Sequence, residues 1–248
     1  RNNTEAWVVN QVSDSVSIVD LVTGRVRATL RTDDEPADVI FAGTPRRAFV
    51  SCSQANTVMV FDPEDLDAAP IRIPIDGEDP RALATNAFCD VVYVAVFESG
   101  NGSTILGGGM DNPAIFNPPN MVSDLLGPHG GVNPPPNDGA AFNPPINGLL
   151  PTPPRVSLIV KQDELGQWMD DNNGNWTQFV SGPDALLSGR LPGWTLLDHD
   201  VAVIDPGSAS VVAYVDKLMN INMAMAVNPS TDRLSVVGTD ATNEIRFE

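Results

Sequence analysis

The side chains best suited to chemistry in this chain form one cluster, Asp170-Asp171-Asn172-Asn173-Gly174-Asn175. Ca²⁺ takes about six to eight oxygen ligands, and carboxylates and amides on a bent backbone supply them. The cluster is therefore a candidate Ca²⁺ site, with Asp171, Asn173 and Asn175 as ligands and Asp170 adding charge. The spacing departs from an EF-hand loop in its glycine position and lacks the closing Glu. We favour a tight hairpin turn without a metal, because Asp, Asn and Gly tolerate positive φ, and Ca²⁺ is the alternative.

Trp168 and Trp176 flank this cluster. We expect their indoles to clamp a hairpin through a cross-strand aromatic contact. Stacking on a carbohydrate is the alternative for this pair.

His199 stands between Asp198 and Asp200, just before an apolar segment. An imidazole beside two carboxylates has the chemistry of a general base or a metal ligand. We favour a structural His–Asp hydrogen bond at a strand entrance. His129 lies in a Gly-Pro-His-Gly-Gly segment and is expected to be exposed. With two histidines and two cysteines in all, a transition-metal site would have to rely on carboxylates.

Several motifs of catalysis and cofactor binding are missing from the sequence. It contains no G-x-S-x-G, and the glycines at 107–109 lack the Lys and the strand–loop–helix setting of a phosphate loop. It contains no C-x-x-C-H for haem attachment and no C-x-x-C metal pair. Cys52 and Cys89 are expected to be unpaired, with a disulfide between them as the alternative. These observations favour a protein that is not an enzyme.

The composition limits the partners of the chain. Its 248 residues include 32 acidic and 14 basic side chains, for a net charge of -18. Such a charge repels nucleic acid and anionic membranes, and no Lys/Arg patch offsets it. No apolar run reaches the roughly 18 residues that a membrane-spanning helix needs. The chain begins with Arg1 and shows no signal peptide, so we expect a processed protein or, as the repeat phase favours, a piece of a longer one.

Short strands that return about every 42 residues must position these side chains. The segment AWVV at 6–9 reappears as AFVS at 48–51, VYVA at 92–95 and LSVV at 234–237. A second strand follows each of them, at 15–20, 57–62, 200–205 and 243–247. A fixed period of this length with several strands inside it is typical of a radial all-β repeat. The sequence therefore predicts a β-propeller.

The first two repeats are complete. Each continues with an outer strand and, after an acidic residue and a proline (Pro36 or Pro80), with a strand that is apolar on both faces. Four-stranded blades of this kind account for about four blades in all. Because propellers close their ring to cover edge strands, we predict a larger ring or a partner that covers the edges.

An insertion at 98–198 interrupts the third blade. Residues 107–154 hold 12 of the 22 prolines and repeat Phe-Asn-Pro-Pro at 116–119 and 142–145. Proline removes backbone donors, so this tract cannot form a ladder or a helix. We expect an ordered extended loop pinned by the two phenylalanines, with a disordered linker as the alternative. Residues 155–180 predict an added β-hairpin whose turn is the Asp/Asn/Gly cluster.

The segment WVVNQVSDSVSIVDLVTGRVRATL at 7–30 resembles the YVTN-type β-propeller repeat, and weaker copies follow in the next three repeats. Phe49, Ser51 and the insertion depart from the pattern. NMAMAVNP at 222–229 and GQWMDDNNGNW at 166–176 are similar to a subgroup of large secreted bacterial propeller proteins. This resemblance implies a bacterial protein outside the cytoplasm, in the periplasm, at the cell surface or secreted. Some members of the subgroup carry a c-type haem motif further along, which implies a redox domain elsewhere.

Three functions are compatible with these features. The first is a non-catalytic extracytoplasmic scaffold that binds a protein or a surface polymer through its loops and insertion. The second is the propeller portion of a larger c-type cytochrome or other redox protein whose cofactor segment lies outside this chain. The third is an enzyme with its site in the central funnel. We favour the first, because long loops on rigid scaffolds often carry function.

Overall fold

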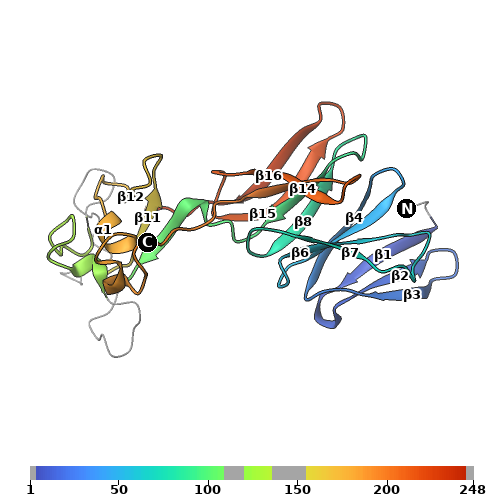
Figure 1. Cartoon of the computed structure of the whole chain (residues 1–248), viewed down its shortest axis with the longest axis horizontal. Helices are drawn as coiled ribbons and strands as arrows, with labels where there is room; N and C mark the ends of the chain where they lie inside the picture. The colour runs from blue at the N-terminus through green and yellow to red at the C-terminus, as the bar shows by residue number, and fades with distance from the viewer. Residues whose placement is uncertain (1–3, 109–119, 136–154, 244–248) are drawn as a thin grey trace, which may run out of the picture. The chain divides into compact units, whose positions relative to one another are not determined.

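The computed structural model describes residues 4–108, 120–135 and 155–243. Over these residues the chain is all-β, with several small antiparallel sheets, and it divides into two compact units (Figure 1). Unit 1 comprises Arg1–Asn101 and Leu197–Asp240, and unit 2 comprises Gly102–Leu196 and Ala241–Glu248. None of the described helices is long and apolar enough to cross a membrane.

The described residues of unit 1 form four antiparallel sheets, numbered here in chain order. Sheet 1 contains β1 (Glu5–Asn10), β2 (Ser15–Asp20) and β3 (Arg25–Arg31). Sheet 2 contains β4 (Pro36–Ala42), β5 (Arg47–Cys52), β6 (Thr57–Phe61) and β7 (Ile71–Pro74). Sheet 3 contains β8 (Pro80–Thr85), β9 (Val92–Val96), β13 (Val201–Asp205) and β14 (Ser210–Val215). Sheet 4 contains β15 (Ile221–Asn228) and β16 (Arg233–Thr239).

Sheet 3 is assembled across the insertion. Its strands run in the order β14-β13-β9-β8, and Val94 of β9 lies opposite Ala202 of β13. The repeat pattern makes these two strands consecutive members of one repeat, although more than a hundred residues separate them in the sequence. The chain therefore passes from unit 1 into unit 2 after β9 and returns to unit 1 before β13, and these two strands are neighbours in one sheet.

Each sequence repeat contributes strands to two sheets, which corrects the predicted blade boundaries. The strand predicted at 37–42 as the fourth of the first repeat is β4, and it pairs with β5 of the next repeat. Likewise, β8 pairs with β9 rather than with β7. The reason is local: a short turn with Gly43 at φ +86° folds β4 back onto β5, whereas the acidic link after β3 crosses to the next sheet.

The acidic links before β4 and β8 share one geometry. Glu35 and Asp79 have positive φ values of 52° and 60°. The backbone N–H of Glu35 donates to Oδ1 of Asp14 at 3.1 Å, and that of Asp79 donates to Oδ1 of Asn56 at 3.0 Å. Asp14 and Asn56 themselves lie in the left-handed region, which Asn and Asp tolerate better than most residues. The repeated acidic residue before proline is therefore a repeated turn.

Apolar side chains on both faces of sheet 2 hold unit 1 together. Phe49 and Val58 belong to a buried cluster shared with sheet 3, whereas Val50 and Met59 belong to a second cluster shared with sheet 1. Successive residues of a strand point to opposite faces, so a strand with neighbours on both sides must be apolar throughout. One strand from each sheet contacts one strand of the next, in the chain order β1, β4, β8 and β15.

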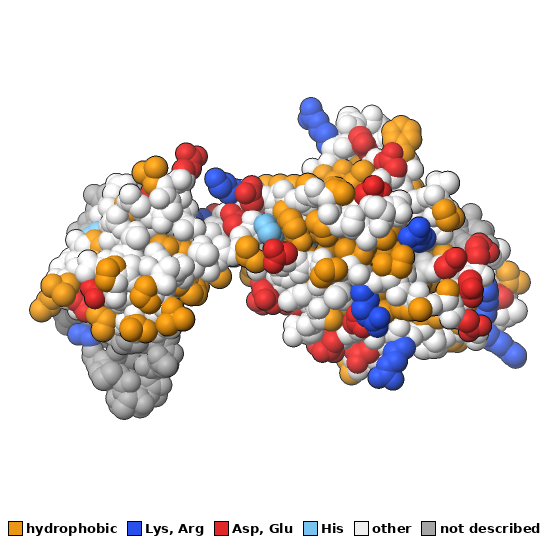
Figure 2. Space-filling view, viewed as in Figure 1, with side chains coloured by type: hydrophobic (Ala, Val, Ile, Leu, Met, Phe, Trp, Pro, Cys, Tyr) orange, Lys and Arg blue, Asp and Glu red, His pale blue; other side chains and the backbone are white. Residues whose placement is uncertain are grey.

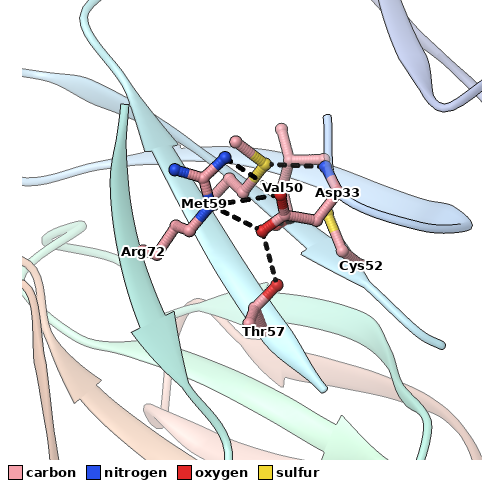
Figure 3. Close-up of polar contacts among 6 residues, drawn as sticks. All are labelled: Asp33, Val50, Cys52, Thr57, Met59 and Arg72. Carbon is pink, nitrogen blue, oxygen red and sulfur yellow. Dashed lines mark hydrogen bonds and ion pairs between the residues drawn. The ribbon is translucent and has the colours of Figure 1, made fainter. Parts of the chain in front are cut away.

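A polar contact connects the segment between β3 and β4 to the outer strand β7. Asp33 in this link accepts hydrogen bonds from Arg72 of β7, with Nε 2.9 Å from Oδ2 and Nη2 3.0 Å from Oδ1 (Figure 3). Oδ2 of Asp33 also accepts from the hydroxyl of Thr57 at 3.3 Å. Cys52 is fully buried nearby, and burial, reinforced by the charge of Asp33, raises the pKa of its thiol to about 12. Cys52 and Cys89 are both free thiols, as favoured from the sequence.

Unit 2 has a sheet and a core of its own. Its sheet contains β10 (Ser103–Leu106), β11 (Leu158–Gln162) and β12 (Trp168–Met169), followed by α1 (Thr177–Val180) and a 3-10 turn at Ala185–Ser188. The buried side chains of its core are Leu106, Met121, Val122, Leu158, Val160, Trp168, Trp176, Phe179 and Val180. Both Phe-Asn-Pro-Pro copies lie outside the described residues.

The hairpin predicted at 155–180 differs in detail from the structure. β11 and β12 pair through a turn that spans Asp163–Gln167, and the Asp/Asn/Gly cluster forms the next turn along the chain. The segment after that turn is the helical turn α1 rather than a strand. Oδ1 of Asn175 accepts from the N–H of Thr177 at 3.0 Å, and this side-chain bond competes with a strand ladder.

The strand predicted at 243–247 is described only at Asn243. The N–H of Ile159 donates to Oδ1 of Asn243 at 2.7 Å, and Nδ2 of Asn243 donates to the carbonyl of Ile159 at 2.7 Å. Asn243 thus binds the backbone of β11 inside unit 2.

Candidate functional site

The turn at Asp170–Asn175 is tightly closed by backbone hydrogen bonds. The N–H of Trp176 donates to the carbonyl of Trp168 at 2.7 Å, and that of Asp170 donates to the carbonyl of Gly174 at 3.0 Å. Met169 and Asn175 form a single antiparallel bridge. The cluster is therefore a hairpin turn, with Asn173 at φ 64°.

Asp170 is buried at the centre of this turn, and protein donors surround its carboxylate. Oδ1 accepts from the backbone N–H groups of Asn172 at 2.9 Å and Gly174 at 2.7 Å. Oδ2 lies 2.8 Å from Nε1 of Trp176 and 2.6 Å from Nε2 of His129. A buried carboxylate with several donors holds the groups around it in place. Asp170 thus fastens the turn to the core tryptophan and to the segment that carries His129.

The other three residues predicted to bind Ca²⁺ have separate surroundings. Oδ2 of Asp171 accepts from the N–H of Asn243 at 2.9 Å. The amide of Asn175 donates to Gln167 at 2.8 Å. Among the described residues, no group of three or more His, Cys, Asp or Glu side chains is arranged to hold a metal ion. Ca²⁺ at this turn stays a prediction.

The tryptophans of unit 2 face inward. Trp168 and Trp176 are fully buried, and the ring of Trp168 lies 5.3 Å from that of Trp194. Trp176 packs at 6.2 Å from Phe179, and Arg190 lies over the ring of Trp194 at 4.8 Å. The two flanking indoles belong to one core instead of offering an open face for a sugar.

His199 has surroundings that differ from those expected. Its ring stacks on Tyr214 at 3.9 Å, and Nδ1 lies 2.6 Å from the backbone carbonyl of Asp76. The neighbouring carboxylates bind elsewhere: Asp198 accepts from the N–H of Lys217 at 3.2 Å, and Asp200 accepts from that of Leu218 at 2.8 Å. The structural hydrogen bond of His199 therefore goes to a carbonyl and not to a flanking aspartate.

Asp198 is half-buried in unit 1, and Asp200 two residues further on is buried. Asp200 is fully buried, and its Oδ1 accepts from Ser99 at 2.9 Å and from Asn222 at 3.0 Å. Burial, followed by repulsion from Asp200, raises the pKa of Asp198 above the ordinary value of an aspartate. The hydrogen bonds of Asp200 therefore connect the segment just before β13 with the start of β15, so this aspartate stabilises the fold.

His129 is the residue that sequence reasoning missed. Its side chain is 11% exposed, in contrast to the exposure expected from its glycine-rich surroundings. Its partner Asp170 lies 41 positions further along the chain. No signal in the sequence near His129 indicated this pair, because only glycine and proline flank the residue.

The surface of unit 2 exposes a run of leucines around the 3-10 turn at Ala185–Ser188. Leu186, Leu187 and Leu191 are 66%, 47% and 68% exposed. The backbone beneath them is fixed, because Ala185 is fully buried and the hydroxyl of Ser188 donates to the carbonyl of Phe179 at 2.6 Å. We call Leu186, Leu187 and Leu191 the leucine surface. Figure 2 shows hydrophobic side chains at several places on the surface of unit 2.

Comparison with known proteins found similarity of structure to β-propeller proteins, but no relative by sequence. No protein-family model and no curated protein matches the chain. Hydrazine synthase from Kuenenia stuttgartiensis matches at 12% identity over 95% of this chain and 80% of that one, with a TM-score of 0.37. Virginiamycin B lyase from Staphylococcus aureus matches at 7% identity over 99% and 69%, with a TM-score of 0.35. The dihydro-heme d1 dehydrogenase NirN matches at 13% identity over 94% and 57%, with a TM-score of 0.33. These are β-propeller proteins, and likeness at this level gives no information on activity.

Proposed function

We propose that this chain is an extracytoplasmic β-propeller scaffold that binds another protein through unit 2. The observation that carries the proposal is the leucine surface, which is held on a compact unit with its own core. Large exposed aliphatic side chains on a fixed backbone are typical of surfaces that bind proteins. Their position on a unit inserted between two strands of a sheet supports a presenting role for the propeller.

The chemistry of the surface favours a protein over a surface polymer. Polysaccharide sites use exposed aromatic faces, and Trp168 and Trp176 are fully buried in this structure. Leucines instead fit an apolar groove or an aliphatic patch of a protein. The location outside the cytoplasm rests on the resemblance to secreted bacterial propeller proteins.

A substitution experiment tests this role. A variant with Leu186→Asp, Leu187→Asp and Leu191→Asp removes the leucine surface, and because these side chains are exposed the fold should be kept. The purified full chain, immobilised, is exposed to a protein extract of the source cell envelope. In parallel it is mixed with purified peptidoglycan sacculi and sedimented. We expect a protein that the wild type retains and the triple variant loses, with no sedimentation.

A matched control uses exposed apolar residues elsewhere. Leu21→Asp, Val26→Asp and Val212→Asp change residues of unit 1 that are 54%, 59% and 60% exposed. This control should retain the same protein as the wild type. Equal retention by the wild type and the leucine-surface variant, or sedimentation with the sacculi that the variant does not reduce, would refute the proposal.

A further inference from the structure

Arg190 lies beside the leucine surface. It follows the 3-10 turn at Ala185–Ser188, and its backbone N–H donates to the carbonyl of Ala185 at 3.0 Å. The next residue in the chain is Leu191, which belongs to the leucine surface. The guanidinium lies over the ring of Trp194, with 4.8 Å between Cζ and the ring centroid. A cation is therefore held at the edge of a group of exposed aliphatic side chains.

Neutral acceptors position the guanidinium of Arg190. Nη1 donates to the carbonyl of Ser188 at 3.3 Å and to its hydroxyl oxygen at 3.0 Å. Nη2 donates to Oγ1 of Thr104 at 2.7 Å and to the carbonyl of Ile105 at 3.0 Å. Thr104 and Ile105 belong to β10, the edge strand of the sheet of unit 2. These bonds fix the side chain, while Nε–H has no partner among the described residues and stays available as a donor.

No carboxylate neutralises Arg190 within the part of the chain that the structure describes. Three other arginines each form an ion pair with a carboxylate: Arg27 with Glu5, Arg72 with Asp33 and Arg81 with Asp79. Arg190 is half-buried, and this burial lowers the pKa of its guanidinium. A partly desolvated cation that has only neutral partners gains from an added anion, because the anion offsets the lost hydration. Arg190 is therefore suited to receive a carboxylate from outside the chain.

We propose that the leucine surface and Arg190 together bind an acidic, leucine-rich segment of a partner protein, with one carboxylate of that segment at the guanidinium. The apolar side chains of the segment pack on the leucines, and its carboxylate forms a charge-assisted hydrogen bond. The net charge of -18 repels acidic proteins in general, so recognition of such a segment requires a local cation. The inference rests on the proposed binding role of unit 2 and adds the chemistry of the partner.

Two fluorescein-labelled peptides of about 18 residues serve as probes, because leucines at every third or fourth position give a helix one apolar face. The peptides share these leucines and differ only beside them, where one carries two glutamates and the other two glutamines. Fluorescence anisotropy with the purified full chain gives both dissociation constants at about 0.15 M salt, where the Debye length is about 8 Å. We expect the glutamate peptide to bind at least about 10-fold more tightly, because its bond to Arg190 exceeds the screened repulsion from the net charge.

Substitutions of Arg190 and Ile105 test the origin of this preference. Arg190→Gln removes the charge and should reduce the difference between the peptides to less than about 2-fold. Ile105→Glu should have the same effect while Arg190 is kept, because it adds a carboxylate at the residue whose carbonyl Arg190 binds, and Ile105 is 59% exposed. Arg25→Gln is the matched control, since Arg25 is exposed in unit 1 and the net charge changes by the same amount. This control should keep the preference of the wild type.

Equal binding of the two peptides to the wild type, or no binding up to about 1 mM, overturns the inference. A preference that a folded Arg190→Gln or Ile105→Glu variant retains also overturns it, and circular dichroism with the melting temperature establishes folding. The triple leucine-surface variant separates this failure from that of the proposed function. If both peptides bind the wild type equally and this variant binds neither, the leucine surface binds protein segments without selecting acidic ones. If the variant binds both peptides like the wild type, the binding role of the leucine surface fails as well.

Discussion

Nε2 of His129 lies 2.6 Å from Oδ2 of Asp170, and this contact joins two segments of unit 2 that are 41 residues apart in the sequence. Both side chains have little exposure, 11% for His129 and 2% for Asp170. The same oxygen accepts from Nε1 of the buried Trp176. The pair therefore connects a glycine-rich loop, a turn and the core of the unit through one carboxylate.

We expect Asp170→Asn to destabilise unit 2 by about 3 kcal/mol. The amide keeps one acceptor for the backbone N–H groups but places NH₂ against His129 or Trp176, which leaves a buried donor unsatisfied. Urea unfolding followed by tryptophan fluorescence measures the effect. Asp163→Asn is the matched control, because exposed Asp163 accepts from two backbone N–H groups through Oδ1 alone. Equal stability of the two variants would contradict a central role for Asp170.

Gly174 tests the same site by steric means. A Cβ at this position would lie against Oδ2 of Asp170 and 2.7 Å from Nε2 of His129, in a place with no room for it. Gly174→Ala should therefore cost about 2 kcal/mol in the free energy of unfolding. Gly207→Ala serves as control, since its Cβ would meet only the end of the Asp205 side chain, at 3.1 Å. If both substitutions have the same small effect, the packing described around Asp170 is incorrect.

The strands of unit 1 could be predicted from the sequence because their pattern is local. The segment Ser15–Asp20 was expected and is β2, and 210–215 was expected and is β14. The pairing of the strands could not be predicted from the sequence. β4 has the apolar pattern of an inner strand whether it pairs backward or forward, and the turn at Gly43 decides the outcome.

The candidate site was harder to predict because its contacts are distant in sequence. The Asp/Asn/Gly cluster was recognisable as a turn, since its residues tolerate the required backbone angles. The partner of Asp170 was not recognisable, because nothing near His129 in the sequence indicates burial. Exposure of Leu186 and Leu191 was equally hidden: an apolar residue in a loop has the same sequence signature whether it packs inward or faces solvent.

Cys52 should make stability depend on alkaline pH. Burial raises the pKa of its thiol to about 12, whereas the unfolded thiol titrates near 9.0. Below pH 9 both states are protonated and the stability is fully present. Above pH 9 the unfolded state loses its proton first, so stability should fall by up to about 1.4 kcal/mol per pH unit.

A comparison with Cys52→Ala isolates this contribution, because that variant lacks the thiol but keeps all other titrating groups. The stability difference between wild type and variant should be constant from pH 7 to 8.5 and should shrink from pH 9 upward. Alkylation with iodoacetamide at pH 8 gives a second measure. Cys89, which is partly exposed, should react in the native protein, and Cys52 should react only in urea. Rapid native labelling of Cys52 would refute its burial.

Asp198→Asn should stabilise unit 1 at neutral pH. Burial and the charge of Asp200 raise the pKa of Asp198 in the folded protein, so the charged form is disfavoured there. A raised pKa gives a contribution to stability that is fully present below the unfolded value and is lost as pH rises through the folded value. Asparagine is uncharged at every pH, and its oxygen can still accept from the N–H of Lys217, which Asp198 binds at 3.2 Å. The gain should therefore be present at pH 7 and absent near pH 3, as measured by thermal unfolding at both values.

Asp67→Asn, at an exposed aspartate, should give no such pH-dependent gain. A variant that is less stable than the wild type at pH 7 would show that the charge of Asp198 is needed by its surroundings and that repulsion from Asp200 does not dominate.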